Sequence, residues 1–239
     1  SLSCMTSLRS CSTLSLTSSA IGLSALKLLE LFNDADDHKM FVYGEFYGTI
    51  ANFNTPFQLC CEMLNHGKDI GLLHGETFGA IWNGIYFLHK GLLAAIELSK
   101  LQKECKYQEG LVEGDSDQYF GMTAAFTDLI KNTIDIFTGD KPFSGSIDGE
   151  DYMGDWPSPG TTVMRYEFLK KYHHSVRAFW TRNFSQCVWC TNFLVMHKSL
   201  PLPTSMMMKF YGALAGYCLS NSEKENSMID VAIATMREK

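Results

Sequence analysis

The sequence lacks the features that mark several common functional classes. No uninterrupted apolar run of about 18 residues occurs among its 239 residues, so no membrane-spanning helix is expected. Lys and Arg form no cluster and the net charge is −6, which argues against nucleic-acid binding, because neutralising phosphates requires clustered cations. No charged segment followed by a short apolar run indicates a secretory signal.

Motifs of catalysis are also missing. The sequence contains neither a Gly-x-Ser-x-Gly nucleophile elbow nor a Gly-x-x-x-x-Gly-Lys-Ser/Thr phosphate-binding loop. We therefore expect no catalytic residue, no cofactor site and no metal site, and this segment is not expected to be an enzyme. With 46% hydrophobic and 19% charged residues, the chain can nevertheless bury a sizeable core.

The alternation of apolar and polar residues that marks a half-buried strand never extends over six positions. Apolar residues recur instead at three- and four-residue spacing, which predicts an all-α fold. The expected helices cover residues 20–32, 38–51, 56–74, 76–91, 92–107, 119–137, 164–180, 184–197, 204–219 and 222–237.

Residues 56–91 predict a helical hairpin at the centre of this arrangement. Pro56 can open the first helix, because the N–H that proline lacks has no partner in a first helical turn. Gly75 can end that helix with a positive φ, and Gly91 can end the second helix in the same way. The short connection between them makes the two helices antiparallel neighbours.

A second hairpin of similar sequence is expected 107 residues further along the chain. Residues 75–82 (GETFGAIW) align with residues 182–189 (RNFSQCVW), so Ala80 corresponds to Cys187. A third similarity, between residues 46–51 and 210–215, has a different offset. Self-similarity on the scale of a helical hairpin predicts a repeat array.

Residues 138–162 form the one long segment without helical periodicity. It contains Gly, Pro and Ser together with five acidic residues: Asp140, Asp148, Glu150, Asp151 and Asp155. A segment of this length is expected to be a flexible or functional loop, and its spacing matches no known calcium loop. We expect residues 1–239 to form a single helical-repeat region that is a fragment of a longer chain.

The second hairpin also offers the alternative of a metal or redox site. Cys187 and Cys190 form a Cys-x-x-Cys pair in the first turn of a predicted helix, although no strand precedes it. Zinc would need two further ligands, for which His173, His174 and His197 are the nearest candidates. The chain would then be an all-α metal- or small-molecule-binding domain. The competing interpretation is that the eight cysteines are reduced, buried thiols of a cytoplasmic protein.

The spacing of particular residues resembles a known family. After the helix that begins at Phe57, the pattern consists of a Gly-acid turn, a small residue, an aromatic residue, a glycine and Leu-x-x-x-Glu: Gly75, Glu76, Ala80, Tyr86, Gly91, Leu93 and Glu97. Residues 165–219 continue it with a hairpin and a helix that contains Phe210-Tyr211-Gly212-Ala213-Leu214. About residues 35–220 thus resemble the tetratricopeptide-like helical region of large signalling proteins. In these proteins an AAA/STAND-type ATPase module precedes the helices, and a histidine kinase or nucleotide cyclase domain often follows.

The resemblance implies a non-catalytic scaffold or regulatory region in the cytoplasm, built from antiparallel hairpins stacked as an α–α superhelix. Its partner would be another protein or a flanking domain of the same chain. Two departures from the family pattern are Cys187, which stands where a small Ala is expected, and the acidic segment 138–162. No ATPase or kinase catalytic motif lies within the chain, so no active-site residue can be carried over.

Overall fold

The computed structural model describes residues 19–29, 31–32, 36–51, 54–113, 118–142, 161–196 and 203–220. Within these ranges the secondary structure is helical and contains no strand, which confirms the all-α prediction. The chain divides into two compact units, Ser1–Thr127 and Asp128–Lys239, and the boundary falls within helix α6 (Gln118–Thr138). None of the described helices has the length and apolar character needed to cross a membrane.

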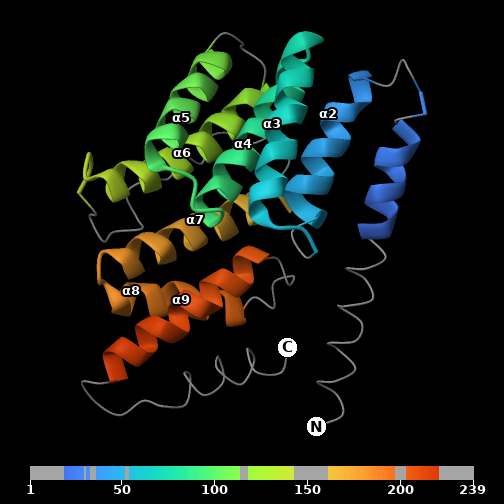
Figure 1. The fold of residues 1–239 in the computed structure, drawn as a ribbon. Coiled ribbons are helices and arrows are strands. Elements are labelled where there is room, and N and C mark those ends of the chain that lie inside the picture. Colours follow the sequence, from blue (N-terminus) through green and yellow to red (C-terminus); the bar gives the residue numbers. More distant parts are fainter. Residues whose placement is uncertain are drawn as a thin grey trace, which may run out of the picture. The chain divides into compact units, whose positions relative to one another are not determined.

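The first unit begins with a helical segment at residues 19–29. The elements that follow are α2 (Asp36–Glu45), a π-helical turn η1 (Phe46–Ile50), α3 (Phe57–Leu73), α4 (Thr77–Leu93) and α5 (Leu98–Glu113). α3 packs against both α2 and α4, and α5 packs against α4 (Figure 1). Their shared core contains fully buried aliphatic side chains: Met40, Leu64, Ile81, Leu88 and Leu101.

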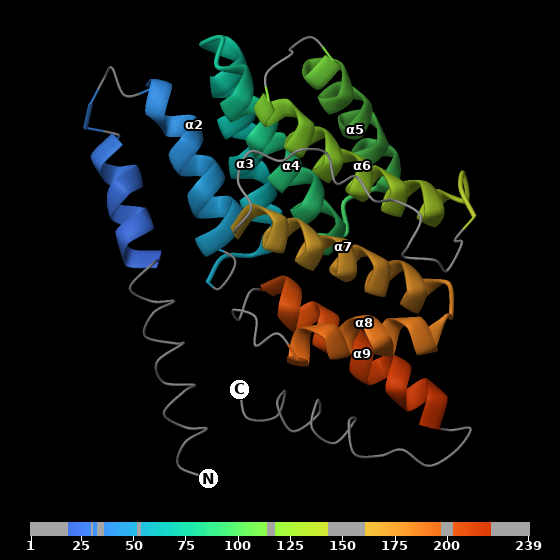
Figure 2. The same cartoon turned by 180° about the vertical axis from the view of Figure 1, so that it is seen from behind.

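In the second unit the helices after α6 are α7 (Thr161–Trp180), α8 (Phe184–Met196) and α9 (Pro203–Ser220). Each of these three helices packs against the other two, as Figure 2 shows from behind. Three small residues meet at the centre of this packing: Ala178, Cys187 and Ala215. Small side chains let three helix backbones approach closely. Larger side chains, such as those of Phe179 and Tyr211, pack around this contact.

The two hairpins that the sequence predicted 107 residues apart have the same turn. Gly75 after α3 and Arg182 after α7 both have positive φ, 75° and 63°. Each turn is closed by a 2.8 Å hydrogen bond from a backbone N–H to the carbonyl five residues earlier: Glu76 to Gly71, and Asn183 to Ala178. This is the Schellman arrangement of a helix end. The turns are therefore structurally equivalent, whereas the stacking of hairpins as an α–α superhelix stays a prediction.

The equivalence of the turns leads to a first expected result. Arg182 has a Cβ in a left-handed conformation that costs about 1 kcal/mol for residues other than glycine. Arg182→Gly is therefore expected to raise the free energy of unfolding of the second unit by about 1 kcal/mol. Native-state hydrogen exchange would measure it, with Gly75→Ala as the reverse control that destabilises the first unit. A second unit that is no more stable in Arg182→Gly would contradict the prediction.

Each hairpin is joined to a third helix by a buried side-chain hydrogen bond. In the first unit the Asn83 amide of α4 donates to the Met40 carbonyl of α2 at 2.8 Å. In the second unit the Thr191 hydroxyl of α8 lies 3.2 Å from the Met208 carbonyl of α9 and 3.0 Å from the Cys187 carbonyl of its own helix, so the two acceptors share its single proton. The third helix precedes the hairpin in the first unit and follows it in the second.

The third sequence similarity, between residues 46–51 and 210–215, is local and does not mark an equivalent hairpin. Residues 46–50 form the π-helical turn η1, whereas residues 210–215 lie within the regular helix α9. The two segments share a packing requirement, because an added Cβ would lie 2.5 Å from the Tyr86 ring at Gly48 and 2.2 Å from the Thr191 hydroxyl at Gly212. Both glycines permit close contact with the second helix of a hairpin.

The prediction that Gly91 ends a helix was wrong. α4 continues beyond it, and Ala95 makes the turn with φ 54°. The Ile96 N–H donates to the Gly91 carbonyl at 2.9 Å and closes this turn. Gly91 is needed for packing instead, because a Cβ there would lie 2.6 Å from a Leu101 methyl group. α5 likewise continues to Glu113, beyond the helix end that was expected at residue 107.

Several predicted features lie outside the described residues. These include most of the acidic segment 138–162, the ligand candidate His197 and the helix expected at residues 222–237. At the described ends of the acidic segment, Gly139 (φ 84°) makes a further left-handed turn after α6, and α7 already begins at Thr161.

Candidate functional site

An aromatic cluster forms where the end of α7, the start of α8 and the middle of α9 meet. It consists of Phe179, Trp180, Phe184 and Tyr211. The Phe179 ring centroid lies 5.9 Å from those of Trp180 and Phe184. It lies 5.1 Å from that of Tyr211. Aromatic pairs at these distances attract one another through their ring edges and faces.

Trp180 is the exposed member of the aromatic cluster. Its side chain is 62% exposed, and its ring meets that of Phe179 in an edge-to-face arrangement. The contact with Phe179 orients the ring, which presents a large, partly apolar surface to solvent. Burial, which is the largest influence, raises the pKa of Tyr211.

The corresponding position in the first hairpin has no aromatic cluster. Leu73 occupies the place of Trp180 at the end of α3 and is 82% exposed. Leu72 and Thr77 occupy the places of Phe179 and Phe184. The two hairpins therefore share a turn but present different surfaces there.

A second exposed tryptophan, Trp189, lies further along α8. The Lys171 ammonium group sits 4.6 Å from its ring centroid, which is a cation–π contact. The equivalent residue of the first hairpin, Trp82, packs instead against the rings of Tyr86 and Phe126 at 5.3 and 6.3 Å.

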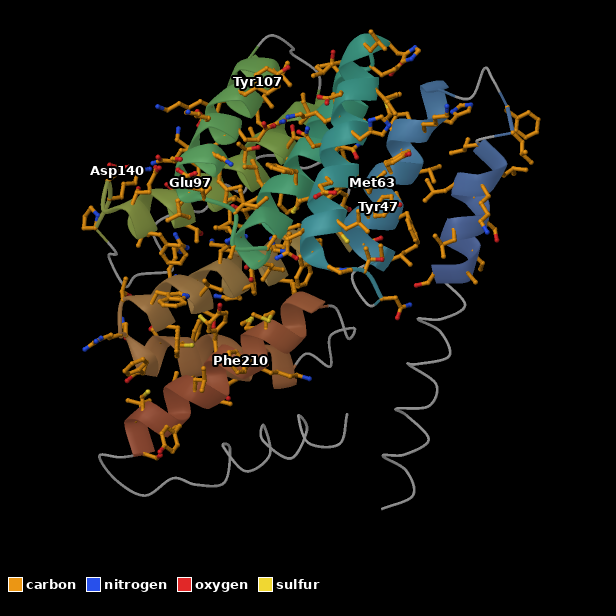
Figure 3. The ribbon with its side chains drawn as sticks, in the orientation of Figure 1. Tyr47, Met63, Glu97, Tyr107, Asp140 and Phe210 are labelled. Atoms are coloured by element: carbon orange, nitrogen blue, oxygen red, sulfur yellow. The ribbon has the colours of Figure 1, made fainter. Side chains whose placement is uncertain are left out.

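Three exposed apolar residues follow one face of α9. Phe210, Leu214 and Tyr217 are 40%, 37% and 58% exposed. Their spacing of four and three residues places them on one side of the helix, and we call them the α9 stripe. Phe210 lies midway along α9 (Figure 3) and its ring is 5.8 Å from that of Tyr211 in the aromatic cluster. Lys209 is the one charged residue in α9.

Cys187 and Cys190, considered above as metal ligands or redox thiols, are one turn apart in α8 and fully buried. The Cys187 sulfur lies 3.3 Å from the Ser175 hydroxyl. Burial raises the pKa of Cys187 to about 11 and that of Cys190 to about 12. Thiols with these pKa values stay protonated near neutral pH, whereas nucleophiles and metal ligands are thiolates.

The two histidines considered with them are buried in α7. The Nδ1 atom of His173 lies 3.1 Å from the Thr133 hydroxyl of α6. Burial, assisted by the positive charge of Arg177, lowers the pKa of His173 to about 3. The same influences, with smaller ones from lysines, lower the pKa of His174 to about 4. Among the described side chains, no group of three or more His, Cys, Asp or Glu could hold a metal ion.

The first unit contains a polar network between α3 and α5 that the sequence did not reveal. The Lys68 ammonium group lies 2.8 Å from both carboxylate oxygens of Glu104. The Gln108 amide donates to the same carboxylate at 2.7 Å. Lys68 and Gln108 are buried. The network stabilises the helix packing, since each of its charges is compensated where water is scarce.

A second buried lysine, Lys90 of α4, lies near Cys60 and Cys61 of α3. Its side chain is 3% exposed, and its ammonium group is 5.8 Å from the Phe57 ring centroid. No salt bridge joins Lys90 to a carboxylate among the described residues. Burial therefore lowers the pKa of Lys90 to about 8, against a smaller opposing influence of the two cysteines.

Lys90→Met is expected to stabilise the first unit by about 2 kcal/mol at pH 7, because the variant no longer buries an uncompensated charge. In the unmodified protein, the unfolded chain holds the Lys90 proton up to about pH 10.5, whereas the folded chain releases it near pH 8. Stability should therefore rise between these pH values, and this rise should be absent in Lys90→Met. Urea unfolding at pH 7 and pH 10 measures both effects. A variant that is less stable at pH 7 would contradict the prediction.

The sites described above therefore consist of an exposed aromatic surface with buried thiols and imidazoles in the second unit, and of buried lysines in the first. Comparison with known proteins adds no family: no protein-family model, curated protein or solved structure matches this chain.

Proposed function

We propose that this chain is a non-catalytic helical scaffold that binds a protein partner through the aromatic cluster of its second unit. The observation that carries the proposal is the 62% exposed side chain of Trp180, whose ring packs against Phe179 of the aromatic cluster. Tryptophan, tyrosine and arginine supply a disproportionate share of the binding energy at protein interfaces. Trp180 lies beside Tyr211, and the exposed Arg182 follows it in the turn.

The rigidity of the cluster favours binding further. The small core residues Ala178, Cys187 and Ala215 fix the three helices, and the edge-to-face contact with Phe179 orients the exposed ring. An anchor that is already ordered loses little conformational entropy when a partner binds.

The broader role that we propose is that of a cytoplasmic regulatory region in a multidomain signalling protein of the ATPase or kinase type. This part of the proposal depends on the tetratricopeptide-like spacing of the sequence. In such an array each hairpin contacts its neighbours and the hairpins together form an extended binding surface. A partner bound to one hairpin could then influence the domains on either side.

The test compares Trp180→Ala with Leu73→Ala in the full-length protein. The two variants remove an exposed side chain from equivalent positions, so they are closely matched. Quantitative proximity labelling first identifies proteins enriched near the unmodified chain and near Leu73→Ala but lost from Trp180→Ala. The interaction is then reconstituted with the purified partner, and its affinity is measured by calorimetry.

Trp180→Ala is expected to weaken binding by roughly 30-fold, which corresponds to about 2 kcal/mol for an interface hot spot. Leu73→Ala is expected to bind normally. Circular dichroism should be unchanged in both variants because both side chains are exposed. Equal affinities of the two variants for every reconstituted partner would contradict the proposed function.

A further inference from the structure

Helix α3 of the first unit carries a line of partly exposed, mainly apolar side chains. They are separated by four, three, four and three residues, and we call them the α3 stripe: Leu59, Met63, His66, Ile70 and Leu73. Leu59 and Leu73 are 43% and 82% exposed, and none of the residues that α3 buries belongs to the stripe. The stripe extends over about 21 Å of the helix. An exposed apolar surface of this extent usually marks a contact with another molecule.

The spacing of the α3 stripe indicates that a helix is the element that fits it. Side chains that alternate at intervals of three and four residues line one edge of a helix, and two helices interlock along such an edge. Two tyrosines extend this surface onto α2 and η1, since the Tyr43 ring lies 5.5 Å from that of His66 and 5.7 Å from that of Tyr47. Met63 of the stripe and Tyr47 can be followed in Figure 3. An amphipathic helix places its apolar face on a surface of this kind.

Two acidic residues border the α3 stripe without a counter-charge. Glu62 and Asp69 are exposed, and each directly precedes a member of the stripe. Neither carboxylate forms an ion pair with a described residue. A helix docked on the stripe would bring its own flanking residues beside these carboxylates, and charges at such positions decide which helices pair. Lysine or arginine on the docked helix would supply the missing counter-charges.

We propose that the α3 stripe docks an amphipathic helix of another protein, whose apolar edge faces the stripe and whose basic residues lie beside Glu62 and Asp69. A second copy of this chain fits less well. If two copies of α3 packed antiparallel about His66, Glu62 of one copy would lie beside Asp69 of the other, and the like charges would repel. In a parallel pair, Glu62 would face Gly67, which is buried and has no side chain. The inference does not depend on the proposed function, because Trp180 belongs to the other unit.

The test uses the full chain and two synthetic helical peptides with leucine along the apolar edge. The flanking positions hold lysine in one peptide and glutamate in the other, so like charges keep each peptide from pairing with itself. Calorimetry is expected to show that the lysine peptide binds about tenfold more tightly than the glutamate peptide, and that this preference reverses in the double variant Glu62→Lys with Asp69→Lys. No binding of the lysine peptide would overturn the proposal. So would an unchanged preference in the double variant, because general attraction to an acidic chain would then explain the binding.

A matched pair of variants locates the bound peptide. Leu59→Asp and Leu214→Asp replace leucines of similar exposure, 43% and 37%, in the first and the second unit. Leu59→Asp is expected to weaken binding of the lysine peptide about tenfold although it adds a negative charge, whereas Leu214→Asp should leave the affinity unchanged. Circular dichroism checks that both variants fold, and equal effects on binding would overturn the proposal. Sedimentation velocity of the chain alone tests the other occupant, since a dimer that dissociates only in Leu59→Asp would assign the stripe to a second copy and overturn the proposal.

Discussion

At pH 5 the second unit is expected to be about 4 kcal/mol less stable than at pH 7.5, because His173 and His174 are buried in the neutral form. An unfolded histidine binds a proton near pH 6.5, whereas the folded chain binds one only near pH 3 at His173 and near pH 4 at His174. Between pH 6.5 and the lower pKa values of the folded chain, the unfolded chain binds more protons, so a lower pH favours unfolding. Stability is complete above pH 6.5 and is lost as the pH falls towards 4.

Native-state hydrogen exchange at the two pH values can measure this loss in α7. Each histidine should account for about 2 kcal/mol of the loss at pH 5, so His174→Gln and His173→Gln should each remove about half of the pH dependence. Glutamine stays neutral and offers an amide that can hydrogen-bond the Thr133 hydroxyl in place of the His173 ring. His66→Gln, in an exposed position on α3, is the matched control and should leave the second unit unchanged. A pH dependence that persists in the double variant would contradict the assignment.

Glu104→Leu is expected to lower the free energy of unfolding of the first unit by about 3 kcal/mol, because it leaves the buried Lys68 ammonium group without a counter-charge. The same substitution removes the acceptor of the Gln108 amide. The Phe87 and Tyr107 rings, 5.9 and 5.3 Å from Lys68, compensate only part of the loss. Urea unfolding and hydrogen exchange of α3 and α5 would measure the change.

A double-mutant cycle separates the ion pair from the loss of packing. Lys68→Met combined with Glu104→Leu should recover most of the stability that Glu104→Leu alone removes, since no buried charge then remains. Lys141→Met is the control, because Lys141 is largely exposed and its 3.5 Å pair with Asp135 should contribute less than about 1 kcal/mol. If Glu104→Leu and Lys141→Met have equal effects, the network does not stabilise the unit as described.

The parts of the fold that depend on local periodicity could be predicted from the sequence. The helices expected at residues 119–137, 184–197 and 204–219 differ by at most one residue at either end from α6, α8 and α9. The equivalence of Gly75 and Arg182 was also predictable by aligning the hairpins, even though arginine rarely adopts a positive φ. The similarity of the residues that follow the turn predicted this equivalence, and the type of the turn residue did not.

Helix ends and long-range contacts could not be predicted in this way. Gly91 had the residue type of a helix end, but tertiary packing against Leu101 required a glycine there and moved the turn to Ala95. Lys68 and Glu104 are 36 residues apart, and no local pattern indicates that they meet. The exposure of Trp180 was equally hidden, because apolar spacing predicts that a residue lies on a helix face and not whether that face is covered.

The equivalence of the two hairpin turns also bears on how the chain could gain or lose length during evolution. A deletion of residues 76–182 would join Gly75 directly to Asn183 and leave a turn with the same backbone geometry. Gly71 corresponds to Ala178 of the second hairpin, and Ala80 corresponds to Cys187. Gly71, the smaller residue of the first pair, would then face Cys187, the larger residue of the second pair. Unequal recombination at this point could therefore change the number of hairpins without breaking the turn that connects them.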